Sequence, residues 1–120
     1  MRTGNDIKQE VNVQLAQLQR DYIAKLPIKI APVNQDWQSL QLTGEDEITI
    51  KSMQRKLHAI AGTSSTLGVE QVAALTYCIE ELLDRGSLTP ECRQAIAQRM
   101  SELNQLIDSN TLEASPMVFK

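Results

Sequence analysis

The sequence predicts an all-α protein: an up-and-down antiparallel four-helix bundle with an additional short helix near the N-terminal side. Apolar residues recur at spacings of three and four along most of the chain, which is the period of one helical face. Alternating β-branched runs of the kind that form strands are missing, and the chain has only four aromatic residues. Short breaks rich in glycine or proline separate the helical stretches, which favours antiparallel neighbours.

Length and charge narrow the class of protein further. A chain of 120 residues fits one domain, and we expect a core over about residues 5–108 with residues 109–120 as a loose tail. Twelve basic residues against fifteen acidic ones argue against nucleic acid as a partner. No apolar run approaches the ~18 residues of a membrane span, and the start lacks the apolar stretch of a signal peptide. We therefore expect a cytoplasmic protein that does not contact a membrane.

The first predicted helix ends at Pro27, because proline disfavours helical conformation in the residue before it. Its apolar stripe consists of Ile7, Val11, Leu15, Leu18, Tyr22 and Leu26. A shorter helix is predicted between residues 28 and 42, with Pro32 near its start. This short helix carries Val33, Trp37 and Leu40 at helical spacing.

Three further helices follow. Gly44 ends the preceding segment, and the acidic run of residues 45–47 favours a helix N-terminus through the macrodipole. The next stripe is Ile50, Met53, Leu57, Ile60, Ser64 and Leu67, and Gly68 then provides a left-handed C-cap. The fourth stripe is Val72, Leu75, Ile79 and Leu82. Either Ser87 or Thr89 caps the last helix, whose stripe is Cys92, Ile96, Met100, Leu103 and Ile107.

Several kinds of active site find no support in the sequence. Cys78 and Cys92 match no redox or zinc spacing, so we expect reduced thiols and no metal site or cofactor in this chain. Gly62 and Gly68 are not followed by the Lys-Ser/Thr of a phosphate-binding loop, and neither HExxH nor a dinucleotide fingerprint is present. A Ser–His–Asp triad assembles in space and is not decided by spacing, but nothing resembles a nucleophile elbow.

The single histidine, His58, lies beside the predicted core seam and not in it. Its helical neighbours form a second, solvent-facing stripe: Lys51, Gln54, Arg55, Ala61, Gly62 and Ser65. A glycine inside a helix lowers the stability of the helix by about 1 kcal/mol relative to alanine, so the presence of Gly62 needs an explanation. One explanation is a patch poor in side chains, where a second protein brings its backbone or a phosphoryl group close to His58. The alternative is that His58 is an ordinary surface histidine and Gly62 is a helix-packing residue.

Residues 57–68, LHAIAGTSSTLG, resemble the motif of histidine-containing phosphotransfer (HPt) domains of bacterial two-component phosphorelays. The matching positions are His58, Ile60, Gly62, Thr63, Ser64, Leu67 and Gly68. The resemblance extends over about residues 10–108, through Tyr22 to Pro27, Trp37, Leu40, Val72, Leu75, Ile79 and Glu80. One departure is Ala61, where many members have a lysine that steadies the phosphoryl group. Arg55 and Lys51 could supply part of that charge.

The resemblance implies that His58 accepts a phosphoryl group from a receiver-domain phospho-aspartate and relays it to another receiver. The implied partners are receiver domains of response regulators or hybrid histidine kinases. They would bring the Mg²⁺ and a lysine, so this chain would be a monomeric phosphoryl carrier and not an enzyme. Docking would use the surface around His58 and part of the following helix, including Gln71 and Thr76.

Three alternatives stay open at this point. A helical adaptor would bind a receiver or kinase without carrying phosphate, and the missing lysine is the feature that favours it. A structural or oligomer-forming bundle would need a large exposed apolar face, which the predicted stripes do not provide. A dimeric histidine kinase module would need a following ATP-binding domain, for which 120 residues leave no space.

Overall fold

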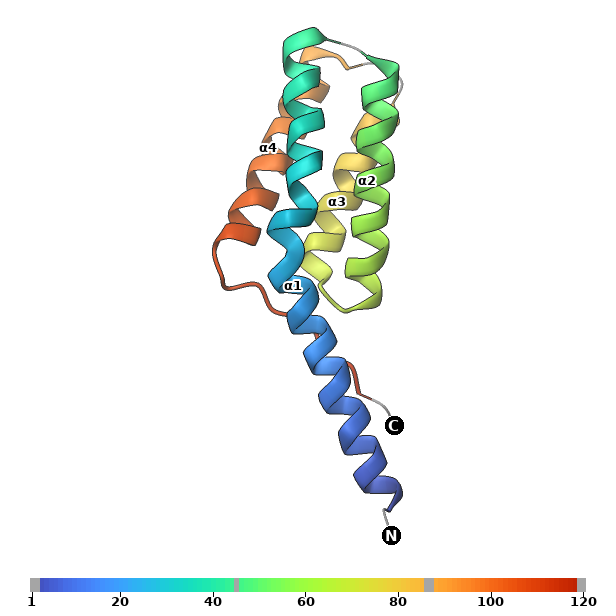
Figure 1. Cartoon of the computed structure of the whole chain (residues 1–120). Helices are drawn as coiled ribbons and strands as arrows, with labels where there is room; N and C mark the ends of the chain where they lie inside the picture. The colour runs from blue at the N-terminus through green and yellow to red at the C-terminus, as the bar shows by residue number, and fades with distance from the viewer. Residues whose placement is uncertain (1–2, 45, 86–87, 119–120) are drawn as a thin grey trace.

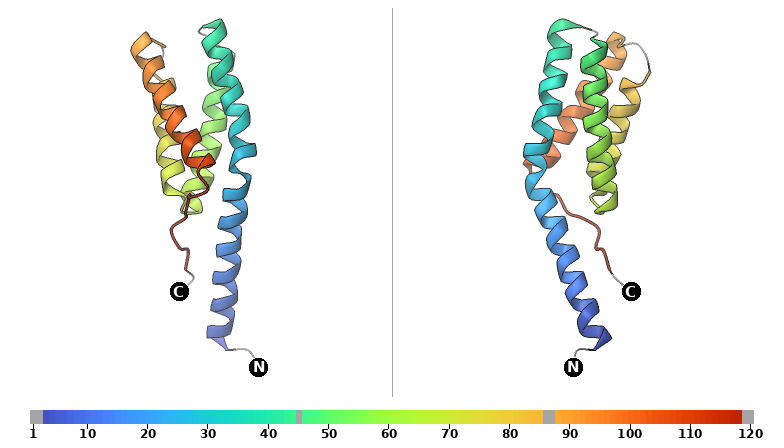
Figure 2. Two further views of the ribbon diagram at one scale, coloured as in Figure 1. Left: turned by 90° about the vertical axis from the view of Figure 1, so that its left-hand side faces the viewer. Right: turned by 45° about the vertical axis from the view of Figure 1, so that its right-hand side comes forward.

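Four helices form an up-and-down bundle in the computed structural model, which describes residues 3–44, 46–85 and 88–118 (Figure 1). They are α1 (Gly4–Thr43), α2 (Glu47–Thr66), α3 (Glu70–Leu83) and α4 (Pro90–Asp108). Consecutive helices run in opposite directions, and the described ranges contain no strand (Figures 1 and 2). The predicted all-α class and four-helix bundle are therefore confirmed.

Helix α1 is continuous over 40 residues, so the predicted break at Pro27 and the separate short helix over 28–42 are wrong. Both Pro27 and Pro32 lie inside α1. The apolar stripe continues through them in register, with Tyr22, Leu26, Ile30, Val33, Trp37 and Leu40 all buried. Burial stabilises by roughly 1.5–3 kcal/mol for each large apolar side chain, so together they outweigh the ~3 kcal/mol that each interior proline costs.

The N-terminal part of α1 extends beyond the other three helices (Figures 1 and 2). Ile7 and Leu18, predicted as core, are 48% and 51% exposed, and the stripe is fully buried only from Tyr22 onward. Thr3 begins the helix with a capping box, in which its hydroxyl accepts from the Asp6 backbone N–H at 3.2 Å. The core therefore starts about five turns into α1, and the longest dimension of the molecule reaches 63 Å.

The helix ends largely follow the predicted capping residues. Gly44 and Gly68 both have positive φ, at +83° and +74°. Asp46 is the N-cap of α2 and accepts from the Ile48 backbone N–H at 3.1 Å. Thr89 is the N-cap of α4, whereas the other candidate, Ser87, lies outside the described residues, as does Glu45.

Residues 109–118 form no helix or strand, but hydrogen bonds attach them to the bundle. They were predicted to be a loose tail, and for these residues that prediction is wrong. The Ser115 N–H donates to the Gly68 carbonyl at 2.9 Å. Gln19 Nε2, on a side chain that is 6% exposed, donates to the carbonyls of Leu67 at 2.8 Å and Ser115 at 2.7 Å. The sequence pattern gave no sign of this because backbone atoms and one amide make the attachment.

Candidate functional site

His58 lies in the middle of α2, and its side chain is 71% exposed. The core seam of the same helix runs through Leu57 and Ile60, which are 0% and 6% exposed. The seam fixes the rotation of α2 about its axis, and that rotation turns His58 toward solvent on the side of α3. The predicted exposure of this imidazole is confirmed.

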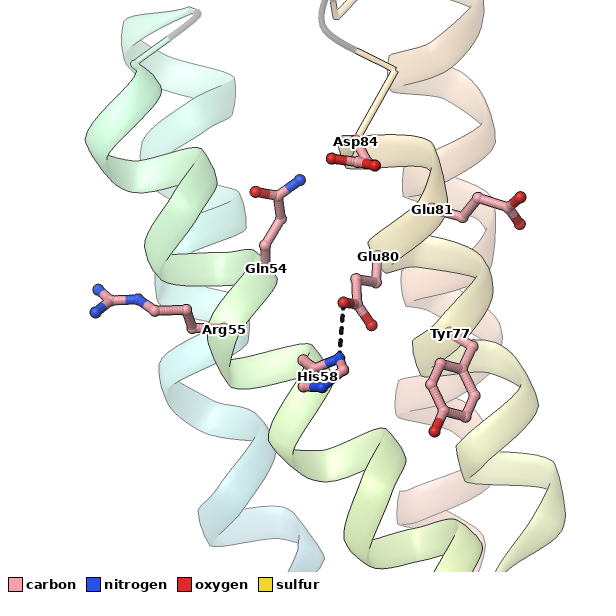
Figure 3. Close-up of a pocket in the computed structure, with 7 residues that line it drawn as sticks. All are labelled: Gln54, Arg55, His58, Tyr77, Glu80, Glu81 and Asp84. Carbon is pink, nitrogen blue, oxygen red and sulfur yellow. Dashed lines mark hydrogen bonds and ion pairs between the residues drawn. The ribbon is translucent and has the colours of Figure 1, made fainter.

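The His58 imidazole is hydrogen-bonded to a side chain of the next helix. His58 Nδ1 lies 2.9 Å from Oε1 of Glu80 on α3 (Figure 3). The Glu80 side chain is only 26% exposed, and the residue before it, Ile79, is fully buried. Because α3 is anchored by Ile79, the carboxylate is presented from a fixed backbone position.

An open depression between α2 and α3 surrounds this pair (Figure 3). Its lining residues are Gln54, Arg55, His58, Tyr77, Glu80, Glu81 and Asp84. Figure 3 shows that the Arg55 side chain points away from α3. The two walls of the depression also differ in charge. The α3 wall carries three carboxylates and the α2 wall carries one guanidinium. The residues of the α2 wall were predicted from the sequence, whereas none of the α3 residues that line the depression was predicted as part of the site.

The other predicted site residues of α2 differ in exposure and in whether they are already paired within the chain. Lys51 is exposed but paired with Glu47, with 3.1 Å between Nζ and Oε1. Arg55 is exposed, and no ion pair or hydrogen bond to it occurs within the described ranges. Gln54 is half-buried and Ser65 is exposed. Arg55 is therefore the uncommitted cation nearest to His58 along the helix, one turn away.

Two predicted docking residues are buried, and those predictions are wrong. Ala61 is 0% exposed, because α2 packs against α1 and α3 and its buried face is wider than the apolar seam. Thr76 is also 0% exposed, and its hydroxyl donates to the Val72 carbonyl at 2.7 Å within α3. Gln71 remains exposed.

Gly62 has no packing reason to be a glycine. A Cβ built on this residue would meet nothing within 4 Å outside its own helix. The interpretation of Gly62 as a helix-packing residue is therefore wrong. The glycine leaves the surface of α2 bare one turn from His58, where another backbone can approach closely.

Helix α2 is fixed to α1 on both sides of His58. Toward the α2 N-terminus, Asp36 on α1 accepts from Lys56 Nζ at 2.8 Å and from Ser52 Oγ at 3.0 Å. Toward the C-terminus, the Tyr22 hydroxyl lies 2.8 Å from Ser64 Oγ, and burial raises the pKa of Tyr22 more than this hydrogen bond lowers it. These contacts hold the imidazole on a rigid support.

Among the residues that the structure describes, neither a metal site nor a membrane span is found. Residues 3–44, 46–85 and 88–118 contain no group of three or more His, Cys, Asp or Glu side chains arranged to hold a metal ion. None of the helices described there has the length and apolar content needed to cross a membrane.

Comparison of the sequence with protein-family models gives one match, and the matched range contains the site described above. The family model for the Hpt domain matches residues 5–109, a range that contains His58 and nearly all of the four helices. No curated protein and no solved structure gave a match in the corresponding searches.

Proposed function

The chain belongs to the Hpt domain family, whose members carry phosphoryl groups on histidine in phosphorelays, and on that premise we propose that His58 is the carrier residue. The observation that supports this assignment most strongly is the state of His58 itself. It is the one histidine of the chain, and it stands 71% exposed on a rigid helix beside the bare surface at Gly62.

In the proposed reaction, His58 takes the phosphoryl group from an aspartyl phosphate of a receiver domain. The lone pair of a neutral imidazole nitrogen attacks phosphorus, the N–P bond forms, and the P–O bond to the aspartate breaks. The aspartate leaves as a carboxylate. In the onward step, the aspartate carboxylate of a second receiver attacks phosphorus, and the N–P bond breaks. The chain is a carrier in this scheme, and the partner assembles the reacting groups.

The neutralising charge for this transfer has to come mainly from the receiver. Phosphoryl transfer depends on alignment and on neutralising the charge of the moving group. The depression around His58 carries three carboxylates against one guanidinium, so its own side chains supply little positive charge. We therefore assign the Mg²⁺ and most of the cationic contacts to the receiver.

Arg55 is the residue of this chain that we assign to the phosphoryl group. Position 61, where many family members have lysine, holds an alanine that is 0% exposed. Lys51 is already paired with Glu47, whereas Arg55 has no such partner among the residues described. We place the receiver-docking surface around His58, over Lys51, Gln54, Arg55, Gly62 and Ser65, with the small area of a transient signalling contact.

A transfer assay tests the proposal. The purified chain is mixed with Mg²⁺ and a panel of phosphorylated receiver domains, and acid-labile phosphate is followed on a phosphate-affinity gel. We expect labelling of the wild type and of Ser101→Ala, an exposed serine of α4 outside the docking surface, and none of His58→Gln. If a receiver binds the wild type but never labels it, the chain is a helical adaptor and the carrier proposal is wrong.

A further inference from the structure

The tail of residues 109–118 is held on the bundle in the way that a binding site holds an extended peptide. The Ser115 N–H donates to the Gly68 carbonyl at 2.9 Å, and Gln19 Nε2 donates to the Ser115 carbonyl at 2.7 Å. Both backbone groups of one residue are therefore bound, one by the turn between α2 and α3 and one by a side chain of α1. Ser115 is exposed, so the bundle holds its backbone and not its side chain.

Gly68 and Gln19 are suited to this contact. A Cβ on Gly68 would lie 2.8 Å from the Ser115 carbonyl oxygen, so the missing side chain makes room for the tail as well as allowing the positive φ of the turn. Gln19 is 6% exposed, and the two hydrogens of its Nε2 go to the carbonyls of Leu67 and Ser115. Without the tail, one of these hydrogens would lose its acceptor at a sheltered position.

Apolar side chains of the tail lie on either side of Ser115. Leu112, Ala114 and Met117 are half-buried and pack against the hydrophobic core. Side chains two residues apart point to the same side of an extended chain, and Pro116 favours an extended conformation at Ser115. Backbone hydrogen bonds combined with spaced side-chain contacts are a common means of recognising an extended peptide.

We propose that Gln19, Leu67 and Gly68 form a peptide-binding site, which the chain's own tail fills and which an extended segment of a partner protein can take over. The partner segment would carry apolar side chains at the same spacing as the tail. The tail lies in no helix or strand, and such terminal segments open at a low cost in free energy because opening restores their conformational entropy. Gly68 follows His58 by ten residues, about 15 Å along α2, so a bound peptide leaves the imidazole uncovered.

A substitution in the tail of the complete chain tests whether the tail fills the site. Leu112→Asp should release the tail, because it places a charge at a half-buried apolar contact. Val118→Asp is the matched control, since it adds the same charge to the same tail at a residue that is 57% exposed. Amide hydrogen exchange should show the Ser115 N–H protected in the wild type and in Val118→Asp, and exchanging freely in Leu112→Asp. Free exchange in the wild type would overturn the proposal.

A fluorescent peptide of residues 109–118 tests the site itself through fluorescence anisotropy. The peptide should bind Leu112→Asp, and it should bind the wild type at least about tenfold more weakly, because a tail that is closed in nine copies out of ten leaves only the remaining sites free. Adding Gln19→Leu to Leu112→Asp should weaken binding about fivefold, the usual effect of losing one hydrogen bond. A peptide N-methylated at Ser115 cannot donate to the Gly68 carbonyl and should not bind. Equal binding of the two peptides, equal binding to the two chains, or no binding to Leu112→Asp would each overturn the proposal.

Light scattering distinguishes a tail that fills its own site from one that fills the site of a second copy. The wild type and Leu112→Asp should both have the mass of one chain. A wild-type dimer that becomes monomeric in Leu112→Asp would show that two copies exchange tails, and it would overturn the proposal. None of these measurements involves phosphorylation of His58, so their outcome is independent of the proposed function.

Discussion

Replacing Gly62 by alanine should make the protein more stable and a poorer phosphoryl carrier. Gly62 is a helical residue of α2, and an added Cβ would meet nothing within 4 Å. The substitution therefore adds no clash and removes the entropic cost of an interior glycine, about 0.5–1 kcal/mol. For a chain of this size, that gain corresponds to a rise in melting temperature of roughly 2–6 °C.

The same methyl group should obstruct the partner. Gly62 lies four residues after His58, so the two positions are neighbours on one helix face. A receiver backbone that rests on the bare glycine would be displaced by about the radius of a methyl group. A misplacement of about 1 Å of the reacting groups can slow a transfer roughly 100-fold. We expect a loss of this order in the transfer rate from a phosphorylated receiver.

Urea denaturation followed by circular dichroism and a quench-flow transfer assay measure the two effects on the same sample. Ala59→Gly is the matched control, because Ala59 is exposed on the same helix and the change has the opposite sign. It should lower the free energy of unfolding by about 0.5–1 kcal/mol and leave transfer within twofold. A destabilised Gly62→Ala would show that the glycine is packed. A stabilised Gly62→Ala that transfers at the wild-type rate would refute the close approach of a partner.

Four further substitutions test the support and the charge around the site. Tyr22→Phe leaves a fully buried hydroxyl of α2 without its partner, and urea denaturation should show a loss of about 1–2 kcal/mol. At the start of α2, the hydrogen bond from Thr49 is the main reason that the pKa of Asp46 lies below its ordinary value of 3.8. The stability that Asp46 contributes is thus present above that value and is lost as the pH falls through the lowered pKa. The urea midpoint of the wild type should fall more steeply than that of Asp46→Asn below about pH 4, and equal slopes would contradict this account. Arg55→Gln should slow transfer by roughly 10-fold, less than a buried donor contributes because the guanidinium is exposed, and Lys51→Gln should change it less than twofold. The reverse ranking would assign the charge to Lys51.

Periodicity predicted the helices well wherever the core decides the structure. The seam from Met53 to Ser64 is buried, and Gly68 ends α2 with positive φ, both as predicted. The error at Pro27 came from applying a local rule to a segment whose burial outweighs it. Likewise Ile7 matches the core stripe in spacing, but spacing does not show where the neighbouring helices end.

The surface of the site was harder to predict than its centre. His58 and its exposure followed from its place beside the seam, but the burial of Ala61 did not. A helix between two neighbours buries a face wider than a two-position seam, and the extra width depends on how closely those neighbours approach. Small residues such as alanine fit either environment, so their type does not reveal which one they occupy.

A simple geometric argument could have predicted which residues of α3 lie beside His58, except for a choice between two flanks of that helix. Gly68 is the turn between α2 and α3, so residues ten before and ten after it, His58 and Cys78, lie level in an antiparallel pair. The core positions of α3 leave two flanks, one with Tyr77 and Glu80 and the other with Cys78 and Leu82. The direction in which the bundle turns decides which flank borders α2, and the hydrophobic pattern is the same for both.

The structure settles that choice through contacts on both sides of α3. Cys92 Sγ of α4 donates to the Leu82 carbonyl at 3.3 Å, which turns the second flank toward α4. The first flank then borders α2, and Glu80 lies 2.9 Å from the imidazole. In a bundle of the opposite turn, Cys78 and not Glu80 would lie level with His58 at this border. The handedness of the bundle, which no single helix encodes, therefore gives the candidate nucleophile its carboxylate.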